Sequence, residues 1–568
     1  MKRRASFLLR ALLLFPLLSV HPPAPASAQQ PTDVPNEPPY FAIRNARIVP
    51  VSGPVIERGT VVVSDGLITA VGADVTVPPE AWVIDGEGLT VYPGLVDALS
   101  DLGLQGAEGG GRGGGPPGGG GGGQNPFASP QGPVAHGPED RPATTPWKSA
   151  ADELTSKDKR IESWRKGGFT TALSVPSEGI FAGQGAVIDL SGDGEGMVVE
   201  TPAAFRVNLT PVGGFRSFPG SLMGVIAYVR QVFLDADHYT RAMAAYEAAP
   251  VGRERPKYDR TLAPVHRAVA EGWPVLLPGN RAREIRRAVR LGRELGVRTV
   301  VAGVQQGWEL AGELASAGVP VLVNLKWPTR TRDADPEADE SLESLRMRAY
   351  APSTPAALEK AGVTFAFYDG GLASPKEALK NVRKAIDEGL SKPGALRALT
   401  LAPARIFGVD DRLGSIEAGK IANLTVTDGD LFDAKTKVKM VFVDGKKFEI
   451  RQPSRPTEAP AADLSGTWTL TVQSPRGAQE STAELEMAED GTLSGTVSGQ
   501  RGEGTITEGW VSGSKFSFTV SSSFGGRTVE ITYTGRIEEG EMKGTVSFGG
   551  RFSTDFTGTR PGGNGGAR

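Results

Sequence analysis

The sequence predicts an α/β protein whose central parallel sheet is preceded by β-rich segments and followed by a separate all-β domain. Three observations support this prediction. Residues 93–404 alternate short apolar runs with amphipathic stretches, β-branched runs with glycine turns come before them, and regularly spaced alternating runs follow a proline-rich linker. A chain of 568 residues exceeds what one hydrophobic core fills, so two or three domains are expected.

Residues 1–28 are typical of a secretory signal peptide. Three basic residues precede a largely apolar run over residues 7–20, and Ala26-Ser27-Ala28 forms a small-residue cleavage site. The apolar run is interrupted by Arg10 and is shorter than the roughly 20 residues that span a bilayer. We therefore expect a periplasmic or secreted protein that begins near Gln29 and has no membrane attachment once the signal is removed.

Composition excludes further classes. The chain has no cysteine, which excludes a disulfide framework and a lipid-modified cysteine at the mature N-terminus. The formal net charge is −3, and no basic stripe interleaved with aromatic residues offsets it. Nucleic acid is therefore not an expected partner.

Residues 40–72 have the pattern of β-hairpins. Short β-branched runs cover residues 40–49 and 59–72, and the second run is interrupted by Asp65-Gly66, a frequent two-residue hairpin turn. The ten residues before them are rich in proline and read as a flexible leader.

The central segment alternates predicted strands with predicted helices. One example is the helix expected from near Asn280, whose apolar residues recur at helical spacing. The strands are expected at residues 169–175, 274–277, 299–304, 320–325 and 363–368. Strand and helix in alternation predict a parallel sheet.

A glycine-rich insertion occupies residues 104–146. A phosphate-binding loop would need a short turn at a helix N-terminus with Lys-Ser or Lys-Thr, and the long glycine tract over residues 106–124 has neither. Its composition predicts a disordered insertion.

The last part of the chain has a different character. A proline-rich linker covers residues 451–462, and residues 463–560 contain regularly spaced runs with period-two alternation between glycine-bearing turns. This pattern predicts either a small antiparallel barrel, lipocalin-like in form, or a sandwich, with a packing or accessory role.

The stretch from Pro93 to Asp101 resembles the first barrel strand of the amidohydrolase superfamily, in its imidazolonepropionase-like branch. That family carries Pro-Gly-Leu-(Ile/Val)-Asp-Ala-His-x-His, in which both histidines are metal ligands. Here Pro93 to Ala98 fit the pattern, whereas Leu99 and Asp101 stand where the histidines would be.

Two further segments resemble the same family. Residues 40–72 and residues 411–446 are similar to the two halves of the small β-sandwich that flanks the barrel in amidohydrolases. The resemblance implies a composite β-sandwich from residues 29–92 and 405–450, around a (β/α)8 TIM-type barrel formed by residues 93–404. In such barrels the site lies at the C-terminal ends of the strands.

The resemblance also implies where the chemistry would lie. Amidohydrolases activate water on one or two metal ions, usually zinc, and an aspartate after the last strand takes the proton. Asp369 falls on that aspartate, and the alternative is that it only caps the next helix or binds loop amides. Leu99, Asp101, Asn280 and Gly303 fall on former ligand positions and are expected to line one site with Asp369.

The histidines expected as metal ligands are absent from those positions. Beyond the signal peptide the chain has only His136, His238 and His266, and none of them ends a predicted strand. Lys326 is the only lysine at such a strand end. The family would bind zinc, but these residues predict that no metal cofactor is held.

Two functions remain open. In the first, the protein is a hydrolase of carbon–nitrogen bonds in small amides or cyclic amides, metal-independent or using a Mg²⁺ or Ca²⁺ that suits carboxylates, with Asp369 as base and Asp101 nearby. In the second, it is a catalytically inactive binding or partner subunit in the periplasm. Such a subunit would form homo-oligomers, or hetero-oligomers with an intact paralogue.

Overall fold

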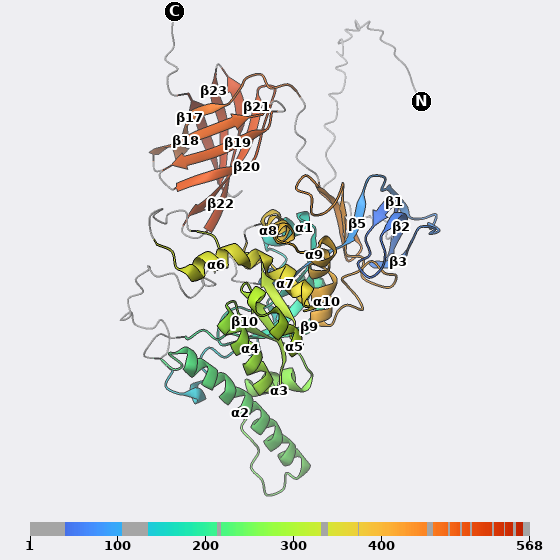
Figure 1. Ribbon diagram of the computed structural model, residues 1–568, viewed down its shortest axis with the longest axis vertical. Helices are drawn as coiled ribbons and strands as arrows, with labels where there is room; N and C mark the ends of the chain where they lie inside the picture. Colours follow the sequence, from blue (N-terminus) through green and yellow to red (C-terminus); the bar gives the residue numbers. More distant parts are fainter. Residues whose placement is uncertain are drawn as a thin grey trace, which may run out of the picture. The chain divides into compact units, whose positions relative to one another are not determined.

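The computed structural model describes residues 40–104, 135–192, 194–212, 217–330, 339–372, 374–450 and 458–560, the last range with short gaps at 475–476, 489–490, 500–501, 525–526, 539 and 549–551. The predicted signal peptide and most of the glycine-rich insertion lie outside these residues. The strands of the described chain form three β-structures (Figure 1). No helix among the described residues is long and apolar enough to cross a membrane.

The first β-structure is one sheet built from both sides of the central segment. Its eight strands run in the order β16-β15-β14-β5-β1-β2-β3, with β4 also paired to β1. The two parts of the chain meet where β5 pairs antiparallel with β14, with Val91 opposite Val426. The strands are β1 (Tyr40–Ile48), β2 (Ile56–Ser64), β3 (Leu67–Gly72), β4 (Trp82–Asp85), β5 (Thr90–Pro93), β14 (Leu424–Thr427), β15 (Val438–Val443) and β16 (Lys446–Glu449).

The predicted hairpin turn at Asp65-Gly66 joins β2 to β3. Both residues have positive φ, 50° and 82°, as a two-residue turn that matches the strand twist requires. The sheet encloses its own hydrophobic core, which includes Phe41, Val61 and Phe442.

The second β-structure is the eight-stranded barrel sheet, in the order β13-β12-β11-β10-β9-β8-β7-β6. Its strands are β6 (Leu95–Ser100), β7 (Phe169–Ser174), β8 (Phe181–Asp189), β9 (Val198–Val207), β10 (Pro274–Gly279), β11 (Arg298–Gly303), β12 (Val321–Asn324) and β13 (Phe365–Tyr368). Mixed α/β architecture with a barrel-like sheet is therefore confirmed.

A regular (β/α)8 arrangement is not what the structure has, because β8 runs antiparallel to both β7 and β9. The reason is the length of the connections. Two neighbouring strands that run parallel need a connection of a dozen or more residues between them. Residues 175–180, between β7 and β8, and residues 190–197, between β8 and β9, are too few for such a crossover. The chain therefore forms hairpins here, and the remaining neighbours pair in parallel.

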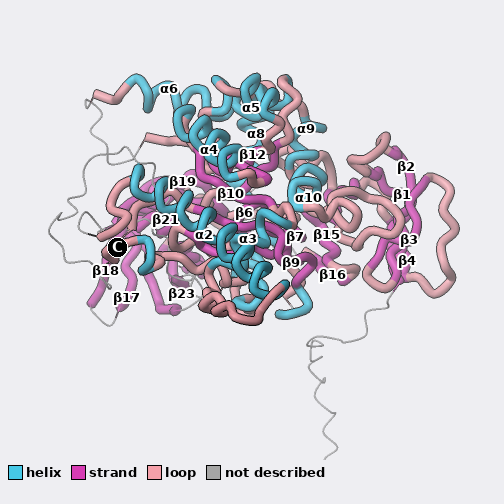
Figure 2. Tube along the Cα trace, turned by 90° about the horizontal axis from the view of Figure 1, so that it is seen from below, coloured by secondary structure: helices cyan, strands magenta, loops and turns pink. Residues whose placement is uncertain are grey.

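Helices follow most of the parallel strands. Figure 2 shows α4, α5 and α8 gathered beside strands β10 and β12. The helices are α1 (Lys159–Lys166), α2 (Leu222–Ala248), α3 (Leu262–Ala270), α4 (Ala282–Leu295), α5 (Ala311–Ala317), α6 (Leu342–Tyr350), α7 (Thr354–Lys360), α8 (Pro375–Asp387), α9 (Lys392–Ala398) and α10 (Leu401–Phe407). Helix α10 contributes Ile406 and Phe407 to the apolar core inside the barrel, together with Leu276 and Leu322.

The third β-structure is a closed antiparallel barrel at the C-terminal end, which decides between the two predicted alternatives. Each strand pairs with the next and β17 pairs with β24. Its interior is filled by aromatic side chains that include Trp468, Phe516, Phe518 and Tyr533. The strands are β17 (Gly466–Ser474), β18 (Gly477–Met487), β19 (Leu493–Gly499), β20 (Gly502–Ser512), β21 (Lys515–Phe524), β22 (Arg527–Glu538), β23 (Glu541–Phe548) and β24 (Phe552–Thr559).

Candidate ligand site at the C-terminal ends of the barrel strands

Side chains that face the barrel interior change from apolar to polar near the C-terminal ends of three strands. Because side chains alternate along a strand, residues two apart share a face. Ala204, Leu322 and Ala366 belong to the apolar core inside the barrel. Two positions further along, the same faces carry Arg206 on β9, Asn324 on β12 and Tyr368 on β13.

Asp97 on β6 is a buried carboxyl group at this end of the barrel. Its side chain is 1% exposed, and its Oδ1 accepts hydrogen bonds from the backbone N–H of Leu99 at 3.4 Å and of Asp369 at 3.2 Å. Its Oδ2 has no hydrogen-bond partner among the described residues. Burial, reinforced by the neighbouring Asp369 carboxylate, raises the pKa of Asp97 well above its usual range. Burial in this environment thus favours the neutral form of the Asp97 carboxyl group.

Asp369 follows β13 directly and is half-buried. Its Oδ1 accepts a hydrogen bond from the N–H of Gly371 at 3.2 Å, while Ser374 Oγ caps the following helix α8. Loss of solvent is the main cause that raises the pKa of Asp369 to about 7, with Asp101 adding to the rise and Arg160 opposing it. This carboxyl group can therefore change charge near neutral pH.

Asp101 is held by an arginine from helix α1. Arg160 Nη1 donates to Asp101 Oδ1 at 2.6 Å, and its Nη2 donates to the Asp101 carbonyl at 3.0 Å. The same guanidinium pairs with Asp158 Oδ2 at 2.7 Å, and the Asp158 side chain is 4% exposed. Asp158 is the N-cap of α1 and also accepts from Gly103 N–H at 2.9 Å. A fixed cation thus lies against the Asp101 carboxylate, which was predicted to stand at a former ligand position.

Arg206 and Tyr368 complete the polar group. Arg206 Nε donates to Asn208 Oδ1 at 3.1 Å, and burial lowers the pKa of Arg206 while Tyr368 and Asp101 oppose that change. Burial also raises the pKa of Tyr368, which keeps its hydroxyl group protonated, and the Asn324 side chain bonds to it. Tyr368 and Asp101 thus act electrostatically on Arg206, although Arg206 lies on β9, Tyr368 on β13 and Asp101 directly after β6.

Asn280 and Gly303 support neighbouring loops. Asn280 Oδ1 accepts from Gln305 N–H at 3.1 Å, and Gln305 Nε2 donates to the Lys326 carbonyl at 2.6 Å. Gly303 has φ +123°, and a Cβ there would lie 3.2 Å from the backbone of Gly279. Asn280 therefore contacts the loop that follows β11, and Gly303 contacts the loop that follows β10. Neither residue belongs to the group of charged side chains around Asp369.

Sequence reasoning singled out Asp101 and Asp369 but not Arg160, Arg206 or Tyr368. One signal for Arg206 was available. It is a charged residue inside the apolar run of residues 203–207, at a position that shares the face of Ala204. Arg160 gave no such signal, because an arginine in the first turn of a polar helix is usually a surface residue.

The residues at this end of the barrel do not fit a zinc site. Leu99 offers no lone pair, and the Asp101 carboxylate is bonded to Arg160. Within the described parts of the chain, no three His, Cys, Asp or Glu residues are grouped so that they could hold a metal ion. His238 lies exposed on α2 and His266 lies half-buried on α3, so neither belongs to a strand.

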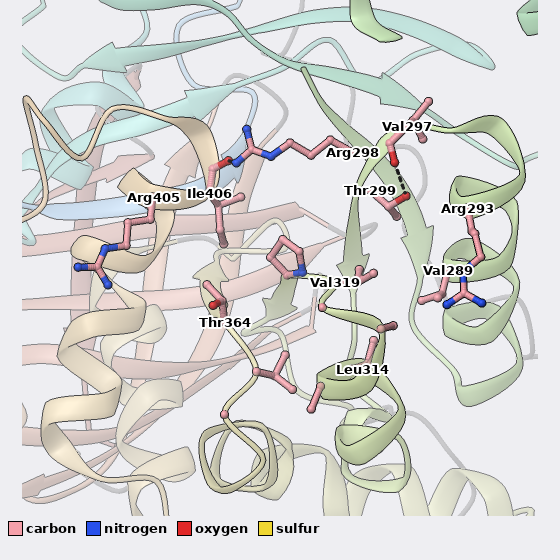
Figure 3. Close-up of a pocket in the computed structure, with 16 residues that line it drawn as sticks. Val289, Arg293, Val297, Arg298, Thr299, Leu314, Val319, Thr364, Arg405 and Ile406 are labelled. Atoms are coloured by element: carbon pink, nitrogen blue, oxygen red, sulfur yellow. Dashed lines mark hydrogen bonds between the residues drawn. The ribbon is translucent and has the colours of Figure 1, made fainter. Parts of the chain in front are cut away.

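A cavity of about 610 Å³ lies at the opposite end of the barrel (Figure 3). It is lined by residues at the N-terminal starts of β11, β12 and β13, among them Thr299, Val319 and Thr364. Arg298 Nη2 donates to the Ile406 carbonyl at 2.9 Å. Figure 3 shows the guanidinium groups of Arg293 and Arg405 far apart on opposite sides of the cavity, so they do not converge on one ligand.

Comparison with known proteins agrees with this fold. The model of the amidohydrolase family matches residues 342–448. A solved amidohydrolase from Thermotoga maritima is 27% identical with a TM-score of 0.59, and the match covers 72% of this chain and 100% of that one. A second solved amidohydrolase is 18% identical with a TM-score of 0.44, covering 72% and 99% of the two chains.

A curated relative matches over a shorter stretch. It is an N-acetylglucosamine-6-phosphate deacetylase from Haemophilus influenzae, 46% identical over 57 residues, which are 10% of this chain and 14% of that enzyme. The family model and the Thermotoga maritima structure confirm the resemblance to the amidohydrolase superfamily. The imidazolonepropionase-like branch of that superfamily stays a prediction.

Proposed function

We propose that this protein binds a small amide or cyclic amide at the C-terminal ends of the barrel strands and does not hydrolyse it with zinc. The observation that supports this most is the pair formed by Arg160 and Asp101. In a metal-dependent member of the class, that carboxylate position would face a metal ion. Here the positive charge comes from the Arg160 side chain, which Asp158 holds in place. Leu99, two residues before Asp101, has no lone pair with which to coordinate a metal ion.

Metal analysis combined with turnover tests this proposal. The purified full chain should contain far less than one equivalent of zinc, and added zinc should not produce hydrolysis of cyclic amides, dipeptides or N-acetylglucosamine 6-phosphate. The last compound is included because of the deacetylase named above. Stoichiometric zinc together with zinc-dependent turnover would overturn the proposal.

A second candidate function is hydrolysis without a metal, and Asp369 favours it. A carboxylate whose pKa is raised to about 7 is a stronger base than an ordinary aspartate and is half deprotonated at neutral pH. It would take a proton from water beside a bound amide carbonyl. Turnover that rises with pH through about 7 and is lost in Asp369→Asn would support this function.

Location and partners are further parts of the proposal. The signal peptide pattern of residues 1–28 supports export to the periplasm or the medium. An inactive member of an enzyme family that acts as a partner subunit would assemble with an intact paralogue. Co-purification of this chain with a histidine-complete amidohydrolase, compared with the chain expressed alone, tests that assembly.

A further inference from the structure

Helix α2 projects beyond α3 and α4, as Figure 1 shows. The hydrophobic core clusters contain no side chain between Tyr239 and Leu262, a stretch that the structure describes in full. The helix nevertheless continues from Thr240 to Ala248, which corresponds to about 13 Å of helix. We call residues 240–258, the end of α2 and the loop after it, the α2 tip. Its side chains lie outside the barrel core.

The base of the α2 tip is fixed to the rest of the protein. Where the chain returns to α3, Cζ of Arg260 lies 3.8 Å from the centre of the Trp147 ring. Further out, Arg253 Nη1 donates to the Ala245 carbonyl at 2.7 Å, which joins the loop to the helix. The outermost side chains are therefore presented from a held base.

Two apolar side chains on the α2 tip are almost fully exposed. Val251 is 95% exposed and Tyr258 is 85% exposed, and no other large hydrophobic side chain among the described residues is as exposed. Isolated exposed apolar residues are common on soluble proteins, but these two share one protruding loop. Removal of their apolar surface from water is favourable. The loop therefore gains free energy from contact with an apolar or interfacial environment.

The same loop is positively charged. Arg253, Arg255 and Lys257 are exposed. Glu254 is the one acidic residue at positions 250–258. Neither Arg255 nor Lys257 forms an ion pair with another described residue. The formal net charge of the whole chain is −3, so the attraction for a negative partner is local to this loop.

Exposed apolar side chains beside unpaired cations match the surface of an anionic lipid bilayer. Tyrosine is favoured at the level of the lipid headgroups, because its ring is apolar and its hydroxyl group is polar. Arginine and lysine at the same depth are attracted by the negative charge of anionic lipids. The α2 tip combines both kinds of contact within one loop.

We propose that the α2 tip binds the surface of an anionic lipid bilayer. Val251 and Tyr258 enter the headgroup region, and Arg255 and Lys257 contact lipid phosphates. The contact is peripheral and reversible, because two apolar side chains and a few cations provide much less binding than a membrane-spanning helix. It goes beyond the sequence-based expectation of no membrane attachment after removal of the signal, and it does not depend on what the barrel binds.

Vesicle co-sedimentation tests this contact. The protein is used from Gln29 onward, because an apolar signal peptide would itself bind lipid. Phosphatidylcholine vesicles with about 30% phosphatidylglycerol should bind it at least about tenfold more strongly than phosphatidylcholine alone. Salt at about 0.5 M should weaken that binding, because it screens exposed charges. Equal binding to both kinds of vesicle, or binding to neither, would overturn the proposal.

Charge variants identify the surface responsible. Arg255→Gln with Lys257→Gln should lower the affinity for anionic vesicles by about tenfold or more. Arg283→Gln with Arg290→Gln removes the same charge from exposed positions on α4 and should change the affinity little. Equal losses in the two double variants would show that overall charge is responsible, and they would contradict the proposal.

A dye at position 251 reports insertion by a second measurement. The chain has no cysteine, so Val251→Cys offers a single thiol for the environment-sensitive dye NBD. Its emission should rise and shift to shorter wavelength with anionic vesicles, because the dye leaves water. Leu342→Cys, at a position on α6 that is 62% exposed, is the control and should show no shift. Vesicle binding without a shift at position 251 would refute insertion of the α2 tip.

Discussion

The backbone N–H of Asp369 donates a hydrogen bond to Asp97 Oδ1 at 3.2 Å, although the two residues are 272 positions apart in the chain. Asp97 lies on β6 and Asp369 directly follows β13, which are the two ends of the barrel sheet. The bond thus joins the first and the last strand at the level of the candidate site. It also fixes the loop that carries Asp369.

Removal of the Asp97 carboxyl group should destabilise the protein. Asp97→Ala leaves the N–H groups of Asp369 and Leu99 without an acceptor, and we expect the free energy of unfolding to fall by about 2 kcal/mol. Asp97→Asn keeps an acceptor oxygen and should cost less. Urea unfolding of both variants measures the difference, and an Asp97→Ala protein as stable as Asp97→Asn would show that the bond is unimportant.

Asp189 should make stability depend on pH. It is 4% exposed and accepts from Asn423 Nδ2 at 2.6 Å and from Thr171 Oγ1 at 3.2 Å, and burial raises its pKa from 3.8 to about 7. Between pH 3.8 and about 7, Asp189 keeps its proton in the folded protein but has lost it in the unfolded chain. The contribution of this group to stability is therefore complete below about pH 4 and disappears as the pH rises through about 7.

Asp189→Asn tests that dependence, because an amide oxygen can accept both bonds without carrying a charge. At about pH 8 the free energy of unfolding of the variant should exceed that of the natural protein by about 1–3 kcal/mol. At about pH 4 the two free energies should be nearly equal. Asp74→Asn, at an exposed position, serves as the control. A gain of the same size at both pH values would contradict the prediction.

The loop after Asp369 requires glycine at position 370. Gly370 has φ +64°, and a Cβ there would lie 1.9 Å from Asn324 Oδ1. Gly371 also has positive φ, +79°, but a Cβ there would meet nothing within 4 Å. Gly370→Ala should therefore lower the melting temperature more than Gly371→Ala, which costs only about 1 kcal/mol of backbone strain. Equal losses would show that the contact with Asn324 is easily relieved.

Restoration of the first-strand histidines should not restore zinc chemistry. Leu99→His with Asp101→His supplies two imidazole groups, but Asn280 and Gly303 still stand at later-strand positions without a metal-binding imidazole. We expect no zinc-dependent hydrolysis of cyclic amides. The double variant also frees Arg160 from Asp101, so Asp101→His alone is the control for stability.

Export predicts a defined N-terminus. Secretion from a bacterial host should yield a mature protein that begins near Gln29. N-terminal sequencing of the protein from the periplasmic or culture fraction measures this. An intact Met1 in that fraction would refute the signal peptide.

Several features were determined by the sequence alone. The alternation of apolar runs and amphipathic stretches predicted the mixed α/β architecture, and period-two alternation predicted the C-terminal β-domain. The loss of metal-binding histidines was evident because the chain has only four histidines and Leu99 and Asp101 interrupt the family pattern. Such conclusions depend on local spacing and composition, which are visible without a fold.

Other features were decided by the tertiary structure. The antiparallel course of β8 depends on pairing with β7 and β9, and the sequence pattern of a strand does not state its direction. The contact of Arg160 with Asp101 spans 59 positions, and the electrostatic effect of Tyr368 on Arg206 depends on which faces of β9 and β13 turn inward. Charges act through space, so the groups that surround Asp369 became identifiable only when strand order and register brought them together.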